Sequence, residues 1–102
     1  TDKIALVTGA SRGIGAEIAR QLAAAGATVI VNYNSSQQAA EQVVADIEAA
    51  GGKAVAMQAD VGDFQQASAL IKAIKKDFGR LDILVNNAGI FRDGLLVKKD
   101  RE

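Results

Sequence analysis

Short apolar runs alternate along the chain with longer segments of helical periodicity. Four runs are too short for helices and show little alternation between apolar and polar positions: Ile4–Val7, Thr28–Val31, Ala54–Gln58 and Leu81–Val85. This pattern is typical of parallel strands that are buried on both faces. The sequence therefore predicts four strands, of which the third is the weakest.

Three segments between these runs have apolar residues every three or four positions, which predicts helices. Glycines follow each segment at the stopping position. The polar stretch 32–36 predicts a turn and an N-cap before the second helix. Asp63, with Gln66 three residues on, resembles a capping box that opens the third. The expected apolar faces are Ile14, Ile18, Ala19, Leu22 and Ala25 in the first helix, Ala40, Val43, Val44 and Ile47 in the second, and Phe64, Ala67, Ile71, Ile74 and Phe78 in the third.

The order of these elements is βαβαβαβ, which right-handed crossovers convert into a parallel sheet. We predict a three-layer, Rossmann-like α/β fold with strand order 3-2-1-4, truncated after the fourth strand. Residues 1–102 form a single domain, and residues 95–102 are a frayed tail or the start of a helix. The first two helices cover one face and the third covers the other. One face is therefore only partly covered, and the fourth strand has an open edge, so we expect a homo-oligomer.

Composition narrows the possible functions. The 102 residues include twelve basic and twelve acidic side chains, which gives no net charge and favours neither nucleic acid nor a membrane surface as a partner. The absence of cysteine and histidine removes thiolate nucleophiles, imidazole bases and the usual zinc ligands. No apolar run reaches the length that spans a bilayer, and the N-terminus does not resemble a signal peptide. We expect a cytoplasmic protein without a metal site.

A glycine-rich loop follows the first strand, with Gly9, Gly13 and Gly15 in the sequence Thr8–Gly15. Gly9 permits the sharp turn, Gly13 lets the backbone approach a pyrophosphate, and Gly15 allows close packing of the helix. The first helix directs its free N–H groups at the bound anion. The alternative is a glycine-rich turn that starts a helix and binds nothing.

The end of the second strand indicates which dinucleotide binds. NAD sites have an acidic residue there, about 20 positions after the loop, which binds the ribose 2′-hydroxyl. This chain has Asn32–Ser35 instead, and Arg12 in the glycine loop is able to bind a 2′-phosphate. NADP(H) is therefore favoured over NAD(H), unless Arg12 is only a solvated loop residue.

Three sequence stretches carry a family resemblance. Thr8–Gly15, Ala59–Val61 and Leu81–Gly89 resemble successive motifs of the short-chain dehydrogenases/reductases, in order and spacing. The glycine loop and the segment Arg92–Leu96 are most similar to the 3-oxoacyl-[acyl-carrier-protein] reductases of fatty acid biosynthesis. Phe91 stands where that group leads us to expect threonine.

The resemblance implies positions for the cofactor. The residues around the 2′-phosphate are Ser11, Arg12, Asn34 and Ser35, with Ile14 in the adjoining loop motif; those at the adenine are Asp60 and Val61; those along the ribose and pyrophosphate are Asn86, Ala88 and Gly89. Parallel strands bring these loops to one crevice independently of the resemblance. Asp60 has the alternative of a turn or cap, and Asn86 that of a structural residue at the strand end.

No catalytic residue is expected. The family reduces ketones with a tyrosine, a lysine four residues later and a serine, all beyond the fourth strand. The only tyrosine is Tyr33, with Gln37 four residues on. We therefore expect an NADP(H)-binding fragment of a short-chain ketoreductase that is inactive alone. The alternatives are half of a split reductase that needs a complementing fragment, and a minimal or engineered Rossmann-like fragment that self-associates.

Overall fold

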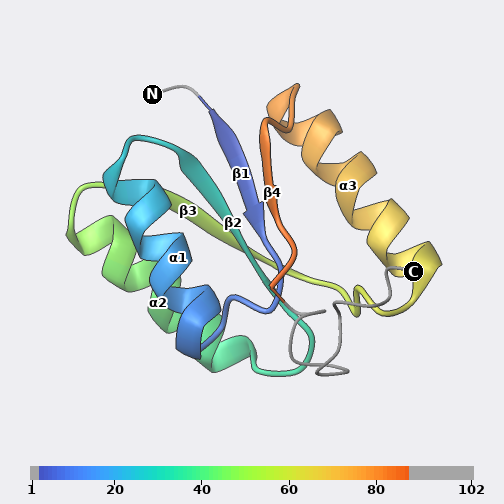
Figure 1. The fold of residues 1–102 in the computed structure, drawn as a ribbon, viewed down its shortest axis with the longest axis horizontal. Coiled ribbons are helices and arrows are strands. Elements are labelled where there is room, and N and C mark those ends of the chain that lie inside the picture. Colours follow the sequence, from blue (N-terminus) through green and yellow to red (C-terminus); the bar gives the residue numbers. More distant parts are fainter. Residues whose placement is uncertain (1–2, 88–102) are drawn as a thin grey trace.

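The computed structural model describes residues 3–87, and in this part of the chain strands and helices alternate (Figure 1). The elements are β1 (Ile4–Val7), α1 (Gly13–Ala24), β2 (Thr28–Tyr33), α2 (Gln37–Ala49), β3 (Lys53–Gln58), α3 (Phe64–Phe78) and β4 (Ile83–Val85). The expected loop after residue 87 and the tail at residues 95–102 lie outside the described residues.

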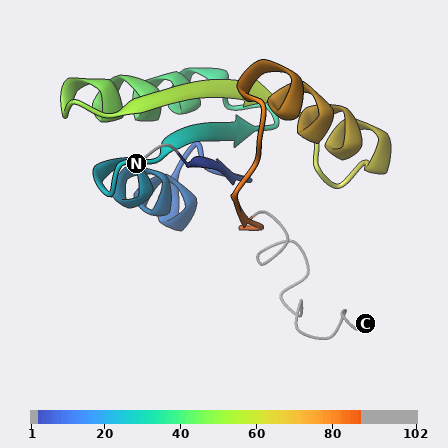
Figure 2. The ribbon, with the colours of Figure 1, turned by 90° about the horizontal axis from the view of Figure 1, so that it is seen from above.

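The four strands form one parallel sheet of order β3-β2-β1-β4, so the predicted topology is confirmed. The chain moves outward from β1 to β2 and β3, then crosses back to place β4 on the other side of β1. Crossovers of one hand therefore put α1 and α2 on one face and α3 on the other, as Figure 2 shows.

The two faces of the sheet have separate apolar cores. On the α1–α2 face, Val7, Val29 and Val31 are fully buried with small helix residues such as Ala19. On the α3 face, Leu6 and Ile30 are buried against Leu70 and Ile74. This alternation along β1 and β2 explains why both strands are apolar at nearly every position.

Three strand boundaries differ from those predicted, and the smallest difference is that β3 begins at Lys53, one residue earlier than expected. The turn was expected from Asn32, but β2 continues through Asn32 and Tyr33, which pair with Met57 and Gln58 of β3. Backbone pairing extends the strand there although the side chains are polar. At the other end, β4 begins at Ile83 and not at residue 81.

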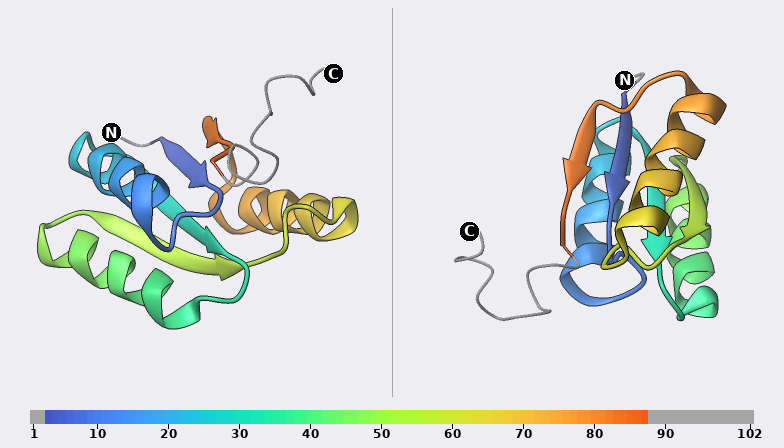
Figure 3. Two further views of the ribbon diagram at one scale, coloured as in Figure 1. Left: turned by 60° about the horizontal axis from the view of Figure 1, so that its bottom comes forward. Right: turned by 90° about the vertical axis from the view of Figure 1, so that its right-hand side faces the viewer.

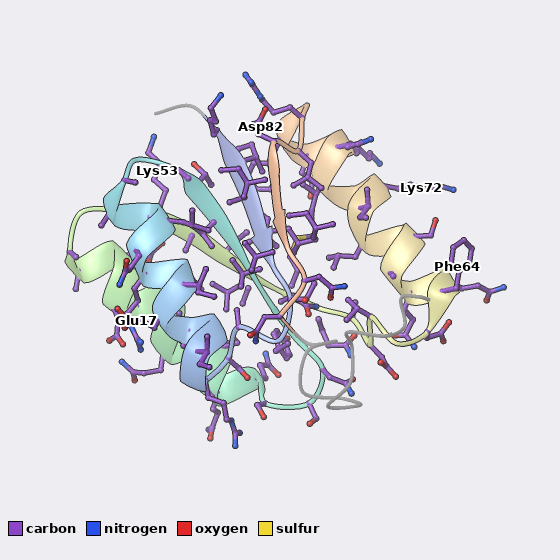
Figure 4. The ribbon with its side chains drawn as sticks, viewed as in Figure 1. Glu17, Lys53, Phe64, Lys72 and Asp82 are labelled. Carbon is purple, nitrogen blue, oxygen red and sulfur yellow. The ribbon has the colours of Figure 1, made fainter. Side chains whose placement is uncertain are left out.

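The predicted apolar face is correct for α2 but wrong at the starts of α1 and α3 and at the end of α1, where Ala25 is exposed beyond the last helical residue. Ile14 of α1 is 59% exposed and Phe64 of α3 is 83% exposed, and Phe64 points away from the molecule in Figure 4. The residues of α1 that reach the core are small: Gly15, Ala16, Ala19 and Ala23. Large side chains flank this contact because α1 lies close to the sheet.

The predicted capping box of α3 forms only in part. The Asp63 carboxylate accepts a hydrogen bond from the N–H of Gln65 at 3.0 Å, as a cap does. The Gln66 side chain, however, accepts from the N–H of Asp60 at 2.8 Å. The N–H of Asp63 donates to the Asp60 carbonyl instead. The box is incomplete because the preceding turn already uses that donor.

One row of residues on the α3 face shows how far a single helix covers the sheet. Leu84, Leu6, Ile30 and Val55 lie side by side in register across the four strands. The inner two are buried, whereas Leu84 is 54% and Val55 36% exposed within the described part of the chain. Helix α3 therefore shields the middle of this face and leaves both margins open.

Candidate nucleotide site

The loops that follow the four strands meet at one edge of the sheet, because parallel strands all end on the same side (Figure 3). The glycine loop follows β1, residues 34–36 follow β2, residues 59–63 follow β3, and Asn86 and Asn87 follow β4. From β1 the chain adds β2 and β3 on one side and then β4 on the other side, so the direction of strand addition reverses at β1. The glycine loop thus lies at the switch point where open α/β sheets bind ligands.

The backbone of this loop requires glycine at several positions. Gly9 has φ 61° and Gly13 has φ 63°, in the left-handed region that side chains disfavour. A Cβ on Gly15 would collide with the Gly9 carbonyl oxygen and would lie 2.6 Å from Asn87 Nδ2. A Cβ on Gly13 would meet nothing within 4 Å, so its surroundings are open. Gly15 has the close packing that the sequence analysis expects, and Gly13 faces open space.

Two buried asparagines hold the peptide groups of Gly9 from opposite sides. Asn32 Oδ1, in β2, accepts from the N–H of Gly9 at 3.2 Å. Asn87 Nδ2, just after β4, donates to the Gly9 carbonyl at 3.1 Å. The two asparagines are only 1% and 3% exposed. The turn after β1 is thereby fixed between its two neighbouring strands.

Helix α1 begins without a side-chain cap. Its N-cap residue is Arg12, with an extended backbone and no capping hydrogen bond, and the first turn has no acidic residue. The N–H groups of Gly13, Ile14 and Gly15 have no partner within the helix, because no helical carbonyl precedes the first turn. Asp63 caps α3, so the chain caps a helix elsewhere. The start of α1 is a set of amide donors with a positive dipole end, which suits an anion.

Arg12 connects the starts of α1 and α2. Its Nη2 donates to Ser36 Oγ at 2.7 Å, and Ser36, the N-cap residue of α2, makes no side-chain cap. These residues line an open hollow of about 380 Å³. Its full lining is Arg12, Ser35, Ser36, Gln37, Gln38 and Ala39, none of which is acidic. A guanidinium and a helix N-terminus face the same space, so the local field is positive.

Asn34 and Ser35 are exposed beside this hollow, as a ligand contact requires. The backbone carbonyl of Asn34 accepts from Gln58 Nε2 at 3.0 Å, so β3 helps to hold the turn. Ser11 is half-buried in the glycine loop. These three residues and Arg12 lie around the starts of α1 and α2.

Asp60 and Val61 lie at the turn between β3 and α3. The Asp60 carboxylate accepts from the N–H of Gly62 at 2.9 Å, which matches the turn role that the sequence analysis left open. Val61 lines a groove of about 140 Å³ with Thr8, Leu84 and Asn86. Asn86 Oδ1 accepts from Thr8 Oγ1 at 3.3 Å, so Asn86 also has a structural bond. Ala88 and Gly89 lie outside the described residues.

Another hollow, of about 320 Å³, lies at the opposite edge of the sheet between the ends of α1 and α2. It is lined mainly by alanine and glycine, with the Arg20–Asp46 ion pair at 3.1 Å. Hydrogen bonds from Gln42 and Arg20 lower the pKa of Asp46. This hollow is remote from the carboxyl ends of the strands and is lined by no helix N-terminus. We therefore place the candidate nucleotide site at the glycine loop.

The described residues hold no group of three or more potential metal ligands from histidine, cysteine, aspartate and glutamate. Within that same range, no helix has the length and apolarity to cross a bilayer. The sequence predicts a turn at Asn32, whereas in the structure this residue is buried and bonded to the glycine loop. Strand pairing with β3, and not the local pattern of polar residues, places Asn32 inside β2.

Fold and edge geometry together define a Rossmann-like α/β unit with an open glycine loop at its switch point. The family model described as short chain dehydrogenase matches residues 3–101, and the chain belongs to this family. A 3-oxoacyl-[acyl-carrier-protein] reductase from Synechocystis is 53% identical over 102 residues. An uncharacterized oxidoreductase from Methylorubrum extorquens is 58% identical over 89 residues. The alignment with the Synechocystis reductase covers 100% of this chain and 41% of that protein. The alignment with the Methylorubrum oxidoreductase covers 87% of this chain and 36% of that protein.

Solved structures agree with the assignment. A metagenomic short-chain oxidoreductase in complex with NADP has a TM-score of 0.81 and 41% identity, over 85% of this chain and 39% of that one. A short chain dehydrogenase from Burkholderia cenocepacia in complex with NADP has a TM-score of 0.77 and 52% identity, over 82% and 34%. At these identities both the fold and the family are shared.

Proposed function

We propose that this chain is the NADP(H)-binding part of a short-chain ketoreductase similar to the 3-oxoacyl-[acyl-carrier-protein] reductases. The observation that carries the proposal is the pair of uncapped helix starts, α1 and α2, joined by Arg12. Both helices direct their first amides, which have no partner within the helix, and their positive dipole ends toward one edge of the sheet. A dinucleotide carries a pyrophosphate and, in NADP(H), a further phosphate at the 2′-oxygen, which provides one anionic group for each helix start.

The residues present fit the pyrophosphate. Gly13 leaves open space where a side chain would stand, so the backbone of the loop is accessible to a phosphate oxygen. In this proposal the amides of Gly13, Ile14 and Gly15 donate to the pyrophosphate. Asn86 lies on the β4 side of the same crevice, toward the ribose, and Asp60 and Val61 lie toward the adenine.

The fit to the 2′-phosphate rests on charge. Arg12 and Ser35 line a hollow without an acidic lining residue, and the exposed Asn34 directly precedes Ser35, so no lining carboxylate repels a phosphate. The position that selects NAD(H) in related sites must face the ribose, and Asn32 cannot do so because it is 1% exposed. Selection therefore falls to Arg12 and the exposed Asn34, which favour NADP(H). Two NADP complexes among the solved relatives support this choice.

The bound nicotinamide supplies a hydride for ketone reduction, and a protein acid must supply the proton. The only tyrosine of this chain, Tyr33, is half-buried and packs against the α1–α2 core. We therefore propose that the chain binds the cofactor without reducing a ketone by itself. Reduction of a 3-oxoacyl thioester needs a tyrosine and a lysine from another segment.

Titration with NADPH and NADH, followed by calorimetry, tests the proposal. We expect saturable binding with a preference for NADPH. In Arg12→Ala the affinity for NADPH falls about tenfold or more, because a charged hydrogen bond to phosphate contributes roughly 1.5–3 kcal/mol. The affinity for NADH changes little, since NADH has no 2′-phosphate.

Arg20→Ala is the matched control, because Arg20 also belongs to α1 but pairs with Asp46 at the opposite edge of the sheet. It leaves the preference for NADPH unchanged. A folded wild-type chain that binds neither dinucleotide contradicts the proposal and leaves the glycine loop as a structural turn.

A second candidate is self-association through the open side of β4, and the exposure of Leu84 favours it. An apolar side chain that is 54% exposed in the last described strand gains from contact with another apolar surface. The same surface would receive a complementing segment in a split reductase. The titration with dinucleotides tests cofactor binding separately from both possibilities.

A further inference from the structure

The side chain of Asn32 joins the glycine loop to the end of β3, although Asn32 is not among the proposed ligand contacts. It is 1% exposed and lies in β2, between the glycine loop and the end of β3. Its Oδ1 accepts from the N–H of Gly9 at 3.2 Å. Its Nδ2 lies 3.2 Å from the carbonyl oxygen of Ala59 and 3.3 Å from that of Met57. One amide group thus joins two loops that are far apart in the sequence.

These surroundings require an amide and fix its orientation. A single backbone donor lies on one side, and carbonyl oxygens lie on the other. Only Oδ1 toward Gly9 and Nδ2 toward β3 satisfies both sides. An aspartate of the same shape has no donor for the carbonyls, and a leucine has neither donor nor acceptor. These hydrogen bonds explain why a polar residue lies in an otherwise apolar part of β2.

The bonded groups border the proposed site at two places. The Asn32 backbone carbonyl also accepts from the N–H of Ala10 at 2.9 Å, so β2 holds two successive amides of the glycine loop. Ala59 directly precedes Asp60 and Val61, and its own N–H donates to the Tyr33 carbonyl at 3.0 Å. Because β2 is hydrogen-bonded to both loops, movement of one loop relative to the other would break some of these hydrogen bonds.

We propose that Asn32 is a positioning residue that fixes the glycine loop to the β3–α3 turn, so that the two loops keep one relative placement. This proposal rests on the proposed function. The bridge holds the pyrophosphate and adenine ends of the site at the separation that one dinucleotide needs. Asn32 does not contact the ligand. Its effect is on the affinity for both dinucleotides and not on the choice between them.

Backbone hydrogen exchange measured by NMR on the 102-residue chain tests the bridge without any ligand. In the wild type we expect the amide of Gly9 to exchange slowly although it lies in a loop. Asn32→Leu removes both halves of the bridge, and Gly9 then exchanges about tenfold faster or more, while Val29 and Val31 stay protected. Asn32→Asp keeps the acceptor for Gly9 and removes the donors, so Ala59 and Asp60 exchange faster and Gly9 does not.

Val43→Ala is the control for lost stability, because Val43 is an apolar side chain of α2 that is buried in the α1–α2 core. It accelerates exchange across the whole chain in proportion to the change in stability. If Asn32→Leu does not fold, Asn32→Ser gives the same test of Gly9, because the shorter side chain stays polar but is too short to join both loops. Unchanged exchange at Gly9 in these variants, or an acceleration no more local than in Val43→Ala, overturns the role of Asn32.

Dinucleotide binding separates this role from the proposed function. We expect NADPH and NADH affinities to fall by the same factor in Asn32→Leu, about tenfold, since one buried hydrogen bond is lost from the loop. A change in their ratio contradicts a positioning role. A wild type that binds neither dinucleotide overturns the proposed function, whereas the exchange experiment still decides whether Asn32 joins the loops.

Discussion

Gly15 shows how a single missing side chain determines the local structure. It lies in the first turn of α1, where alanine is normally the better helix former by about 1 kcal/mol. Here a Cβ would meet the carbonyl oxygen of Gly9 and the amide of Asn87. The contact at this position outweighs the intrinsic preference of the helix.

We predict that Gly15→Ala destabilises the chain by about 1–3 kcal/mol, because the loop or Asn87 must shift to admit the methyl group. The free energy of unfolding in urea measures the effect. Ala24→Gly, at the exposed last residue of the same helix, is the comparison and costs at most about 1 kcal/mol. A Gly15→Ala variant as stable as the wild type would show that the turn yields easily.

Individual residues also mark where sequence reasoning stops. The glycines could be assigned in advance because a sharp turn, an open approach and a close contact each require a missing side chain. Asn32 could not, since its partners at Gly9 and Ala59 are brought to it by strand pairing and are distant in the sequence. Its burial depends on the tertiary structure, and the local pattern of polar residues indicated a turn instead.

At the scale of helices, periodicity located every helix but placed three exposed residues, Ile14, Ala25 and Phe64, on apolar faces. A regular stripe of large apolar residues assumes that the helix packs along its full length. Phe64 stands beyond the edge of the sheet, and Ile14 flanks a contact that only small residues enter. The position of each helix over the sheet decides which of its apolar residues become buried.

The connection between α3 and β4 is tied to the first residue of β1. The Asp82 carboxylate accepts from the Ile4 N–H at 2.8 Å and from Arg80, and it lies at the amino edge of the sheet in Figure 4. The hydrogen bonds from Arg80, and next from the Ile4 backbone, lower the pKa of Asp82 below its ordinary value of 3.8. The charged form is therefore favoured in the folded state.

This shift predicts a pH dependence. A carboxylate with a lowered folded pKa adds stability above its unfolded pKa and loses it as the pH falls through the folded pKa. We expect Asp82→Asn to lower the urea midpoint at pH 7, with the difference from the wild type shrinking below pH 3.8. Asp77→Asn, an exposed carboxylate of α3, changes the midpoint little. A difference for Asp82→Asn that persists unchanged at pH 3 contradicts the explanation by charge.

At the scale of the whole molecule, the sheet order could be derived from the sequence because handedness leaves few alternatives. Alternating strands and helices of similar length permit only a parallel sheet, and the glycine loop marks β1 as the strand at the switch point. The unequal distribution of three helices over two faces follows from the same order. It places Leu84 and Val55 at the two margins of the α3 face.

The two margins differ in what surrounds them, and this difference gives a test of self-association. Both β4 and β3 are outer strands of the described sheet, but Leu84 on β4 lines the apolar groove with Val61 and Ile71. Val55 lies on β3, with polar ends at Lys53 and Gln58. A second copy would gain more apolar contact at β4 than at β3.

We therefore predict that the sedimentation coefficient of the wild type rises with concentration across the micromolar range. In Leu84→Lys the rise disappears, because the charged group must lose its hydration in the contact. Val55→Lys, the matched change at the other margin, retains the concentration dependence. Circular dichroism verifies that both variants are folded. A wild type that stays monomeric throughout removes the proposal of self-association, whereas the titration with NADPH and NADH decides the proposal of dinucleotide binding.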